Sequence, residues 1–320
     1  MPRKPFLMRE ASKGKGIVAL QHSVRLTNGE QMQLRAKSRP RAPVPKDTPI
    51  NRVKTSILNR LPQQEARIRT LVTNTLNEFE RALTVLDGGR NRRTGLLSPA
   101  ERQRAVSRLD EIISKFSTEA QALLQQNAES AVRGYLGAIK AQAGDKGRKM
   151  KVVEASRSAA EEMMSVVVAG ATTRQRVGLI AARMRAELVK SVDMDYLTRV
   201  KRKPTLKARL IDPKGGSTPC VARGLARLNR SEQNRAMHKA TEKVMREAGV
   251  ELAYWRLSAA HKSYGGNEIC EVLAESTGIG VNEALDGRSA SISTVGLYTI
   301  DNFPDIPHPN CMCSIEPVFN

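Results

Sequence analysis

Near the end of the chain, a short run combines two cysteines and a histidine with prolines that stiffen the backbone. The run reads Pro307-His308-Pro309-Asn310-Cys311-Met312-Cys313. It holds two of the four cysteines and one of the four histidines in the 320-residue chain. Two thiolates and an imidazole are typical ligands of a tetrahedral zinc ion. A zinc site is therefore the first chemistry that this sequence suggests.

The remaining ligands of such a site have to come from upstream, where Cys270 and His261 are the candidates. We predict a zinc ion held by Cys270, Cys311, Cys313 and one histidine. His308 is favoured by its place in the run, and His261 is its rival. The alternative is that the cysteines are small buried side chains and that His308 hydrogen-bonds a turn.

A cysteine near a histidine can also form a thiol nucleophile with an imidazole base. The sequence offers no third group to orient that base and no catalytic signature. Metal binding explains the same residues with fewer assumptions. We therefore expect no enzymatic activity.

The terminal run also resembles a known signature. His308-Pro309-Asn310-Cys311-Met312-Cys313, followed by a short apolar segment and Pro317, is similar to the C-terminal motif of the phage Mu F-like minor head proteins, in the head-morphogenesis family of tailed bacteriophages. The segments 227–236 and 247–250 and an aromatic strand with Tyr254 and Trp255 agree with that resemblance, which covers roughly residues 220–320. Leu273 stands where relatives often have a further partner, so a histidine has to complete the metal site.

The resemblance implies a minor head protein that acts in procapsid assembly at the portal vertex. Its expected partners are the portal protein, the scaffold or the major capsid protein, and its expected place is inside the capsid of the virion, near the packaged DNA. Composition alone leaves an alternative, a basic zinc-containing DNA-binding protein of regulatory or recombination type.

The charge of the chain points to a polyanionic partner, since the net charge is +21 and the isoelectric point is about 10.3. Residues 1–54 carry a net charge of +10 and residues 195–235 a net charge of +8, whereas residues 251–320 carry −6. We expect double-stranded DNA to be bound through phosphates without sequence preference. The candidate contacts are basic residues of the first two regions: Lys37, Arg39, Arg41, Lys201, Arg202, Lys203, Arg223, Arg227 and Arg230. The alternative for residues 1–54 is a merely solvated tail.

The middle of the chain has the apolar spacing of long helices. One helix is expected from Leu61 to a stop at Gly88-Gly89. A second is expected from Ser98, where Ser98-Pro99-Ala100-Glu101 combines an N-cap, a proline at the first helical position and a capping-box acid. The second helix should pack on the first as an antiparallel hairpin. Its seam positions are Val106, Leu109, Ile113, Phe116, Ala120 and Leu123.

Further helices are expected at about 152–169, 173–192 and 221–248, the last ending at Gly249. Three short strands are expected at 250–257, 297–300 and 313–315, with a long loop over 276–296. No apolar run approaches the ~20 residues of a membrane span.

These elements predict an α+β protein, mainly helical in its N-terminal and middle regions, with a small C-terminal lobe of short strands and long loops. The predicted divisions are a basic, proline-containing arm over 1–54, a helical domain over 55–195, a basic linker over 196–220 and a C-terminal module over 221–320. Since four cysteines do not suggest a disulfide scaffold and no secretory signal fits the start, we expect synthesis in a reducing host cytoplasm. In that compartment zinc suits a small lobe better than a disulfide.

Overall fold

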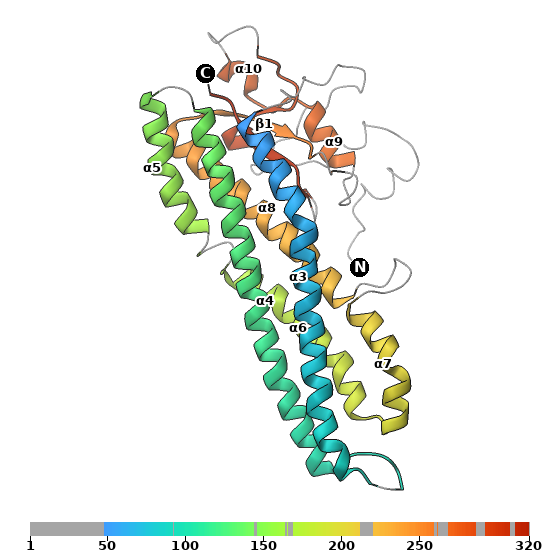
Figure 1. Cartoon of the computed structure of the whole chain (residues 1–320). Coiled ribbons are helices and arrows are strands. Elements are labelled where there is room, and N and C mark those ends of the chain that lie inside the picture. The colour runs from blue at the N-terminus through green and yellow to red at the C-terminus, as the bar shows by residue number, and fades with distance from the viewer. Residues whose placement is uncertain are drawn as a thin grey trace, which may run out of the picture. The chain divides into compact units, whose positions relative to one another are not determined.

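The computed structural model describes residues 48–91, 93–143, 146–163, 165, 169–211, 220–258, 261, 268–285, 292–307 and 311–319. In these residues the fold is mainly α-helical, with a small three-stranded antiparallel sheet near the C-terminus, which confirms the predicted α+β class (Figure 1). The longer elements are α3 (Pro49–Leu86), α4 (Pro99–Gln142), α5 (Lys146–Glu162), α6 (Ala171–Val192), α7 (Tyr196–Leu210), α8 (Val221–Ala248), β1 (Leu252–Arg256), α9 (Glu268–Glu275), β2 (Leu297–Thr299) and β3 (Ser314–Pro317).

Two compact units share these elements. The described residues of Met1–Leu58, Ala131–Met163 and Asn234–Asn320 form one unit, and those of Asn59–Ser130 and Met164–Gln233 form the other. The long helices α3, α4 and α8 each contribute residues to both. The first unit contains the sheet, and is called the sheet unit below; the second is called the helical unit.

In the helical unit, α3 and α4 form the predicted antiparallel hairpin. Lys115 on α4 pairs with Glu78 on α3 at 3.1 Å, and the predicted capping box is present, with the Ser98 hydroxyl donating to Glu101 at 2.7 Å. Most seam positions are buried in the core shared by α3, α4, α6 and α8. Val106 and Leu123 are only partly buried, because a straight helix with 3.6 residues per turn drifts away from a seven-residue repeat.

Helix α3 begins twelve residues before the predicted start at Leu61, so the predicted arm over 1–54 overlaps its first turns. The start has its own local signal, since the Thr48 hydroxyl accepts a hydrogen bond from the Asn51 amide at 3.1 Å and Pro49 takes the first helical position. The helix continues through Pro62, a residue that usually marks a boundary.

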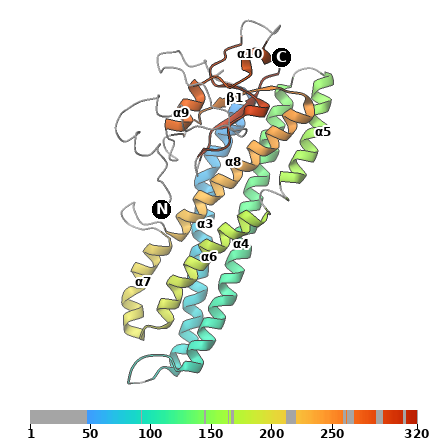
Figure 2. The ribbon, with the colours of Figure 1, turned by 180° about the vertical axis from the view of Figure 1, so that it is seen from behind.

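The structure also corrects the predicted linker over 196–220. Its first part is helix α7, which Asp195 caps by accepting a hydrogen bond from the Thr198 amide at 2.9 Å. Leu206 and Leu210 are buried, while most of the basic side chains remain on the exposed side. Helix α7 folds back beside α6, as Figure 2 shows. Residues 212–219 lie outside the described part.

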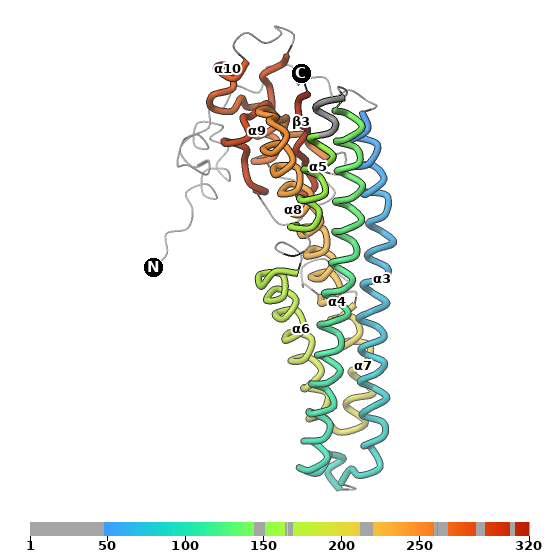
Figure 3. Tube along the Cα trace, turned by 90° about the vertical axis from the view of Figure 1, so that its left-hand side faces the viewer, coloured from blue at the N-terminus to red at the C-terminus, as the bar shows by residue number. Residues whose placement is uncertain are grey.

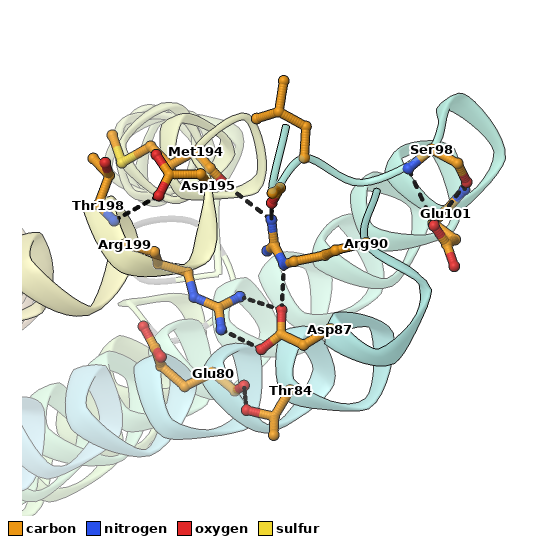
Figure 4. A network of polar contacts seen from close by, with 12 residues as sticks. Glu80, Thr84, Asp87, Arg90, Ser98, Glu101, Met194, Asp195, Thr198 and Arg199 are labelled. Atoms are coloured by element: carbon orange, nitrogen blue, oxygen red, sulfur yellow. Dashed lines mark hydrogen bonds and ion pairs between the residues drawn. The ribbon is translucent and has the colours of Figure 1, made fainter. Parts of the chain in front are cut away.

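Asp87, at the end of α3, joins this helix pair to the hairpin (Figure 4). The Arg199 guanidinium on α7 donates to both carboxylate oxygens of Asp87, at 3.0 and 2.5 Å, and Arg90 donates to one of them at 2.7 Å. Burial pushes the pKa of Asp87 upward, but the hydrogen bonds from Arg199 and Arg90 together hold it below its usual value. Arg90 also donates to the carbonyl of Met194 at 2.9 Å, so one carboxylate helps to position two loops.

In the sheet unit the strand order is β2-β1-β3, and the three predicted strands are confirmed. The central strand β1 places Trp255 opposite Ile315 of β3. The Trp255 ring is buried between His238 of α8, at 5.7 Å between ring centroids, and Phe303, at 5.9 Å. The sheet therefore packs on the C-terminal half of α8, with β3 beside this helix in Figure 3.

The predicted loop over 276–296 contains a short helix, α10 (Val281–Ala284), and residues 286–291 lie outside the described part. The end of the loop is bound tightly to the sheet, since the Trp255 amide donates to the Gly296 carbonyl at 2.7 Å. Gly296 has a φ of 72°, and a Cβ there would lie 2.8 Å from the Ala274 carbonyl oxygen. Glycine is required at this position because of both the left-handed backbone and the close approach.

Candidate metal centre

Three segments of the sheet unit bring a group of cysteines and a histidine together. Cys311 and Cys313 lie directly before β3, and Cys270 lies on α9. His261 comes from the connection between β1 and α9. Helix α9, which the sequence pattern did not predict, turns Cys270 and Leu273 into the interior.

The ligand atoms of this cluster have the spacing of a metal site. The Cys270 and Cys311 sulfurs are 3.9 Å apart, and the Cys313 sulfur is 3.6 Å from Nδ1 of His261. Ligand atoms of His261, Cys270 and Cys313 all lie within 4.8 Å of one another. Ligands bound to a tetrahedral zinc at 2.0–2.3 Å lie roughly 3.3–3.8 Å apart, so the ligand atoms would have to move closer by about 1 Å at most.

The three cysteines of the cluster form no disulfide and are buried, each at most 1% exposed. Hydrogen bonds from the neighbouring thiols of Cys270 and Cys311 hold the pKa of Cys313 well below its usual value. The same contacts, together with burial, raise the pKa of Cys270. The cluster thus favours one thiolate, and a bound cation would be needed to stabilise a second or third.

His261 presents its two ring nitrogens to different partners. Nδ1 faces Cys313, while Nε2 is buried without a hydrogen bond among the described residues and lies 3.9 Å from a carboxylate oxygen of Glu271. A ligating histidine usually directs its other N–H to a carboxylate or carbonyl, which fixes the tautomer. Glu271 stands where that second contact would form.

Other side chains hold the cysteine segment in place. Nε2 of His238, on α8, donates to the Cys313 carbonyl at 2.9 Å, and the Tyr135 hydroxyl donates to the Ile315 carbonyl. Burial lowers the pKa of His238 to about 4, so the ring is neutral near pH 7. These two residues anchor the backbone of Cys313 and β3, and sequence reasoning did not single them out.

The amine of Lys54, on α3, lies next to the cluster. It lines a small cavity together with His238, Met312 and Ser314. Burial lowers the pKa of Lys54, while the nearby Cys313 and Glu316 act in the opposite direction. Three thiolates, one neutral imidazole and Zn²⁺ sum to one net negative charge, which an ammonium group at this place would offset.

Of the five predicted metal ligands, the structure brings four together: His261, Cys270, Cys311 and Cys313. His308 lies outside the described residues. The fourth cysteine, Cys220, is in the helical unit, where its sulfur accepts a hydrogen bond from the Arg223 amide at 3.3 Å. It takes no part in the cluster.

The predicted phosphate contacts are not equivalent. Lys201, Arg202 and Lys203 are exposed on α7, where Lys203 lies 3.7 Å from Glu80. On α8, Arg227 is exposed and Arg223 half-buried. Lys37, Arg39 and Arg41 lie outside the described residues.

Arg230 requires a correction. Its side chain is 9% exposed and forms an ion pair with Glu65 of α3. The arginines of this helix recur at uneven steps, so the helix turns Arg230 inward while Arg227 stays outside. Arg230 is therefore a packing residue rather than a displayed phosphate contact.

Comparisons with protein-family models, with curated protein sequences and with solved structures give no match. Within the described residues, no helix combines the length and the apolar character that crossing a membrane requires.

Proposed function

We propose that the protein is a non-enzymatic assembly protein of a tailed-bacteriophage head, with a C-terminal module held together by one zinc ion. The zinc ligands in this proposal are Cys270, Cys311, Cys313 and His261. The observation that carries it is the convergence of His261, Cys270 and Cys313 within 4.8 Å of one another, with the Cys311 sulfur 3.9 Å from that of Cys270.

The chemistry of the ligand set supports zinc over other metals. Thiolates and imidazole are soft or borderline donors, which favour zinc over magnesium or calcium. A site with four protein ligands has no open position for a substrate, and such closed sites are structural. The burial of all three cysteines supports the same reading, because a nucleophilic thiol has to be reached by its substrate.

The assembly role rests on the terminal motif and on charge. The cysteines of the motif that resembles the Mu F-like minor head proteins are the ones that meet Cys270 and His261. A net charge of +21 suits a protein that lies inside a capsid against packaged DNA, because phosphate contacts need no base recognition. In this proposal the protein acts in procapsid assembly at the portal vertex, and its partners are the portal protein, the scaffold or the major capsid protein.

Metal analysis of the purified full chain tests the zinc module. After purification in reducing buffer, we expect about one zinc per chain. Cys313→Ser and Cys270→Ser should each lose most of it, whereas Cys220→Ser, a buried cysteine outside the cluster, should keep it. His261→Ala and His308→Ala distinguish the two histidines. A fully folded, metal-free protein with reduced thiols would contradict the zinc proposal.

Analysis of particles tests the assembly role separately. The protein should be found by mass spectrometry in purified particles and should be recovered with the portal protein when the two are co-expressed. Its absence from particles, together with specific binding to one DNA sequence, would favour a regulatory or recombination protein instead.

A further inference from the structure

The hairpin of the helical unit carries a groove that the proposed function does not use. It lies between α3 and α4 and has a volume of about 680 Å³. Helix α3 lines it with Glu78, Arg81, Ala82 and Val85, and helix α4 with Arg104, Arg108 and Lys115. On both helices these residues recur at the spacing of one helix face. The groove is therefore a continuous strip along the hairpin.

The groove is shallow and open, and its apolar floor consists of Val85, Ala82 and Leu86. Val85 is 82% exposed, the highest value among the large apolar side chains in the part of the chain that the structure describes. Ala82, one turn earlier, and Leu86 are partly buried against the core. A single exposed valine is common on protein surfaces. Here it lines a shallow groove, where an apolar side chain of a partner would cover it and gain burial.

The rim of the groove is basic. Four of its side chains are cationic and one is acidic. Glu78 is already shared by Lys115 at 3.1 Å and Arg108 at 3.6 Å. Arg81 donates to the backbone of Asn77, and neither Arg81 nor Arg104 has an ion pair with a carboxylate among the described residues. The guanidinium groups of Arg81 and Arg104 thus flank the apolar floor, and each can pair with a carboxylate of a partner.

We propose that this groove binds an acidic amphipathic helix of a partner protein. Apolar side chains of that helix would cover Val85 and Ala82, and its carboxylates would pair with Arg81 and Arg104. The basic N-terminal residues of this chain are repelled by such a rim, so they are not the occupant. DNA fits less well, because its phosphate backbone has no apolar group that would cover Val85 and Ala82. This inference does not depend on the zinc module.

Fluorescence anisotropy with the full chain tests the proposal. The probe is a labelled synthetic peptide of about four helical turns, with Leu on one face and Glu along its edges. The variant Arg81→Glu with Arg104→Glu should weaken binding by about tenfold or more, because two attractive charges become repulsive. Val85→Asp should also weaken it. Arg67→Glu with Arg69→Glu, the same change at exposed positions of α3 outside the groove, should stay within about twofold.

Charge-swapped peptides show whether a loss reflects the groove rather than misfolding. A peptide with Lys in place of Glu should bind the wild-type chain poorly and regain affinity for the Arg81→Glu, Arg104→Glu variant. The proposal is overturned if the wild-type chain does not bind the Glu peptide, or if it binds the Glu and Lys peptides equally well. It is also overturned if the double variants at Arg81 and Arg104 and at Arg67 and Arg69 lose equal affinity for the Glu peptide. If duplex DNA displaces the Glu peptide from the wild-type chain, and the Arg81→Glu, Arg104→Glu variant no longer binds that DNA, the groove is a nucleic-acid surface instead.

Discussion

The sulfur atoms of Cys270 and Cys311 lie 3.9 Å apart in the folded chain, although 41 positions separate the two residues in the sequence. One lies on α9 and the other directly before β3, so a metal between them would join a helix to the last strand. Closing a loop of this length removes conformational freedom from the unfolded chain. This stabilisation would add to that from the buried apolar side chains of the sheet unit, among them Trp255, Tyr298 and Ile315.

Metal removal should therefore unfold the sheet unit, and a single fluorophore can report it. Trp255 is the only tryptophan and is 1% exposed in β1. After treatment with a zinc chelator in reducing buffer, its fluorescence should shift to the red, and added zinc should reverse the change. Cys313→Ser should resemble the chelated protein, and Cys220→Ser should resemble the wild type. An emission spectrum that stays unchanged on chelation argues against a metal staple.

Glu271 provides a finer test of the same site. If Nδ1 of His261 binds the metal, Nε2–H is directed toward the Glu271 carboxylate, which holds the ring in place. Glu271→Ala should lower zinc affinity by about 10- to 100-fold, and Glu271→Gln, which keeps an acceptor, should lower it less. Glu268→Gln, on the exposed side of the same helix, is the control. Competition with a chromogenic chelator measures these affinities, and equal values for Glu271→Ala and Glu268→Gln would exclude the contact.

The sequence identified part of this site because the information was local. The spacing of Cys311 and Cys313 and the rarity of cysteine in the chain were visible without any structure. His238 was not, because it lies 75 positions from Cys313 and contacts only the carbonyl of that residue. This hydrogen bond depends on how α8 packs against β3, and no short-range sequence pattern predicts that packing.

The fold shows the same division between local and tertiary signals. The start of α4 was predictable because Ser98 and Glu101 form the cap between themselves. Helix α7 was missed because its exposed residues are basic and Pro204 lies inside it. Its two buried leucines have meaning only beside a neighbouring helix. Propensity is a weak guide wherever packing decides the outcome.

The ion pair between Asp87 and Arg199 should contribute measurably to the stability of the helical unit. Arg199 is 5% exposed, so Asp87→Asn would leave a buried cation without its carboxylate. We expect the free energy of unfolding to fall by about 3 kcal/mol in urea titrations followed by circular dichroism. Asp110→Asn removes an exposed pair with Arg185 and should cost at most about 1 kcal/mol. If both variants lose the same free energy of unfolding, burial of the Asp87–Arg199 pair does not increase its contribution to stability.

The same pair predicts a pH dependence. The pKa of Asp87 is lower in the folded chain than its usual value of 3.8, because Arg199 and Arg90 outweigh the effect of burial. A lowered carboxyl pKa stabilises the fold above the unfolded-state pKa, and this contribution is lost as the pH falls through the folded-state value. Wild-type stability should therefore decline below about pH 4 more steeply than that of Asp87→Asn. Parallel curves for the two proteins would exclude Asp87 as the titrating group.

DNA binding should distinguish two arginines that are three positions apart on α8. Arg227 is exposed, whereas Arg230 is buried against Glu65. If the chain binds duplex DNA through phosphates, affinity should fall steeply with salt for any sequence, and Arg227→Ala should reduce the slope of log K against log salt by about 1. Arg230→Ala should leave the slope unchanged but lower the free energy of unfolding by about 1–2 kcal/mol.

Removal of residues 1–47, which ends just before the Thr48 cap of α3, tests the basic arm in the same assay. The arm includes Lys37, Arg39 and Arg41, so its loss should flatten the salt dependence more than any single substitution, because each phosphate released contributes about 0.9 to the slope. An unchanged slope would assign the arm to a protein partner or to solvation. A slope reduced by Arg230→Ala would mean that the guanidinium leaves Glu65 when DNA binds.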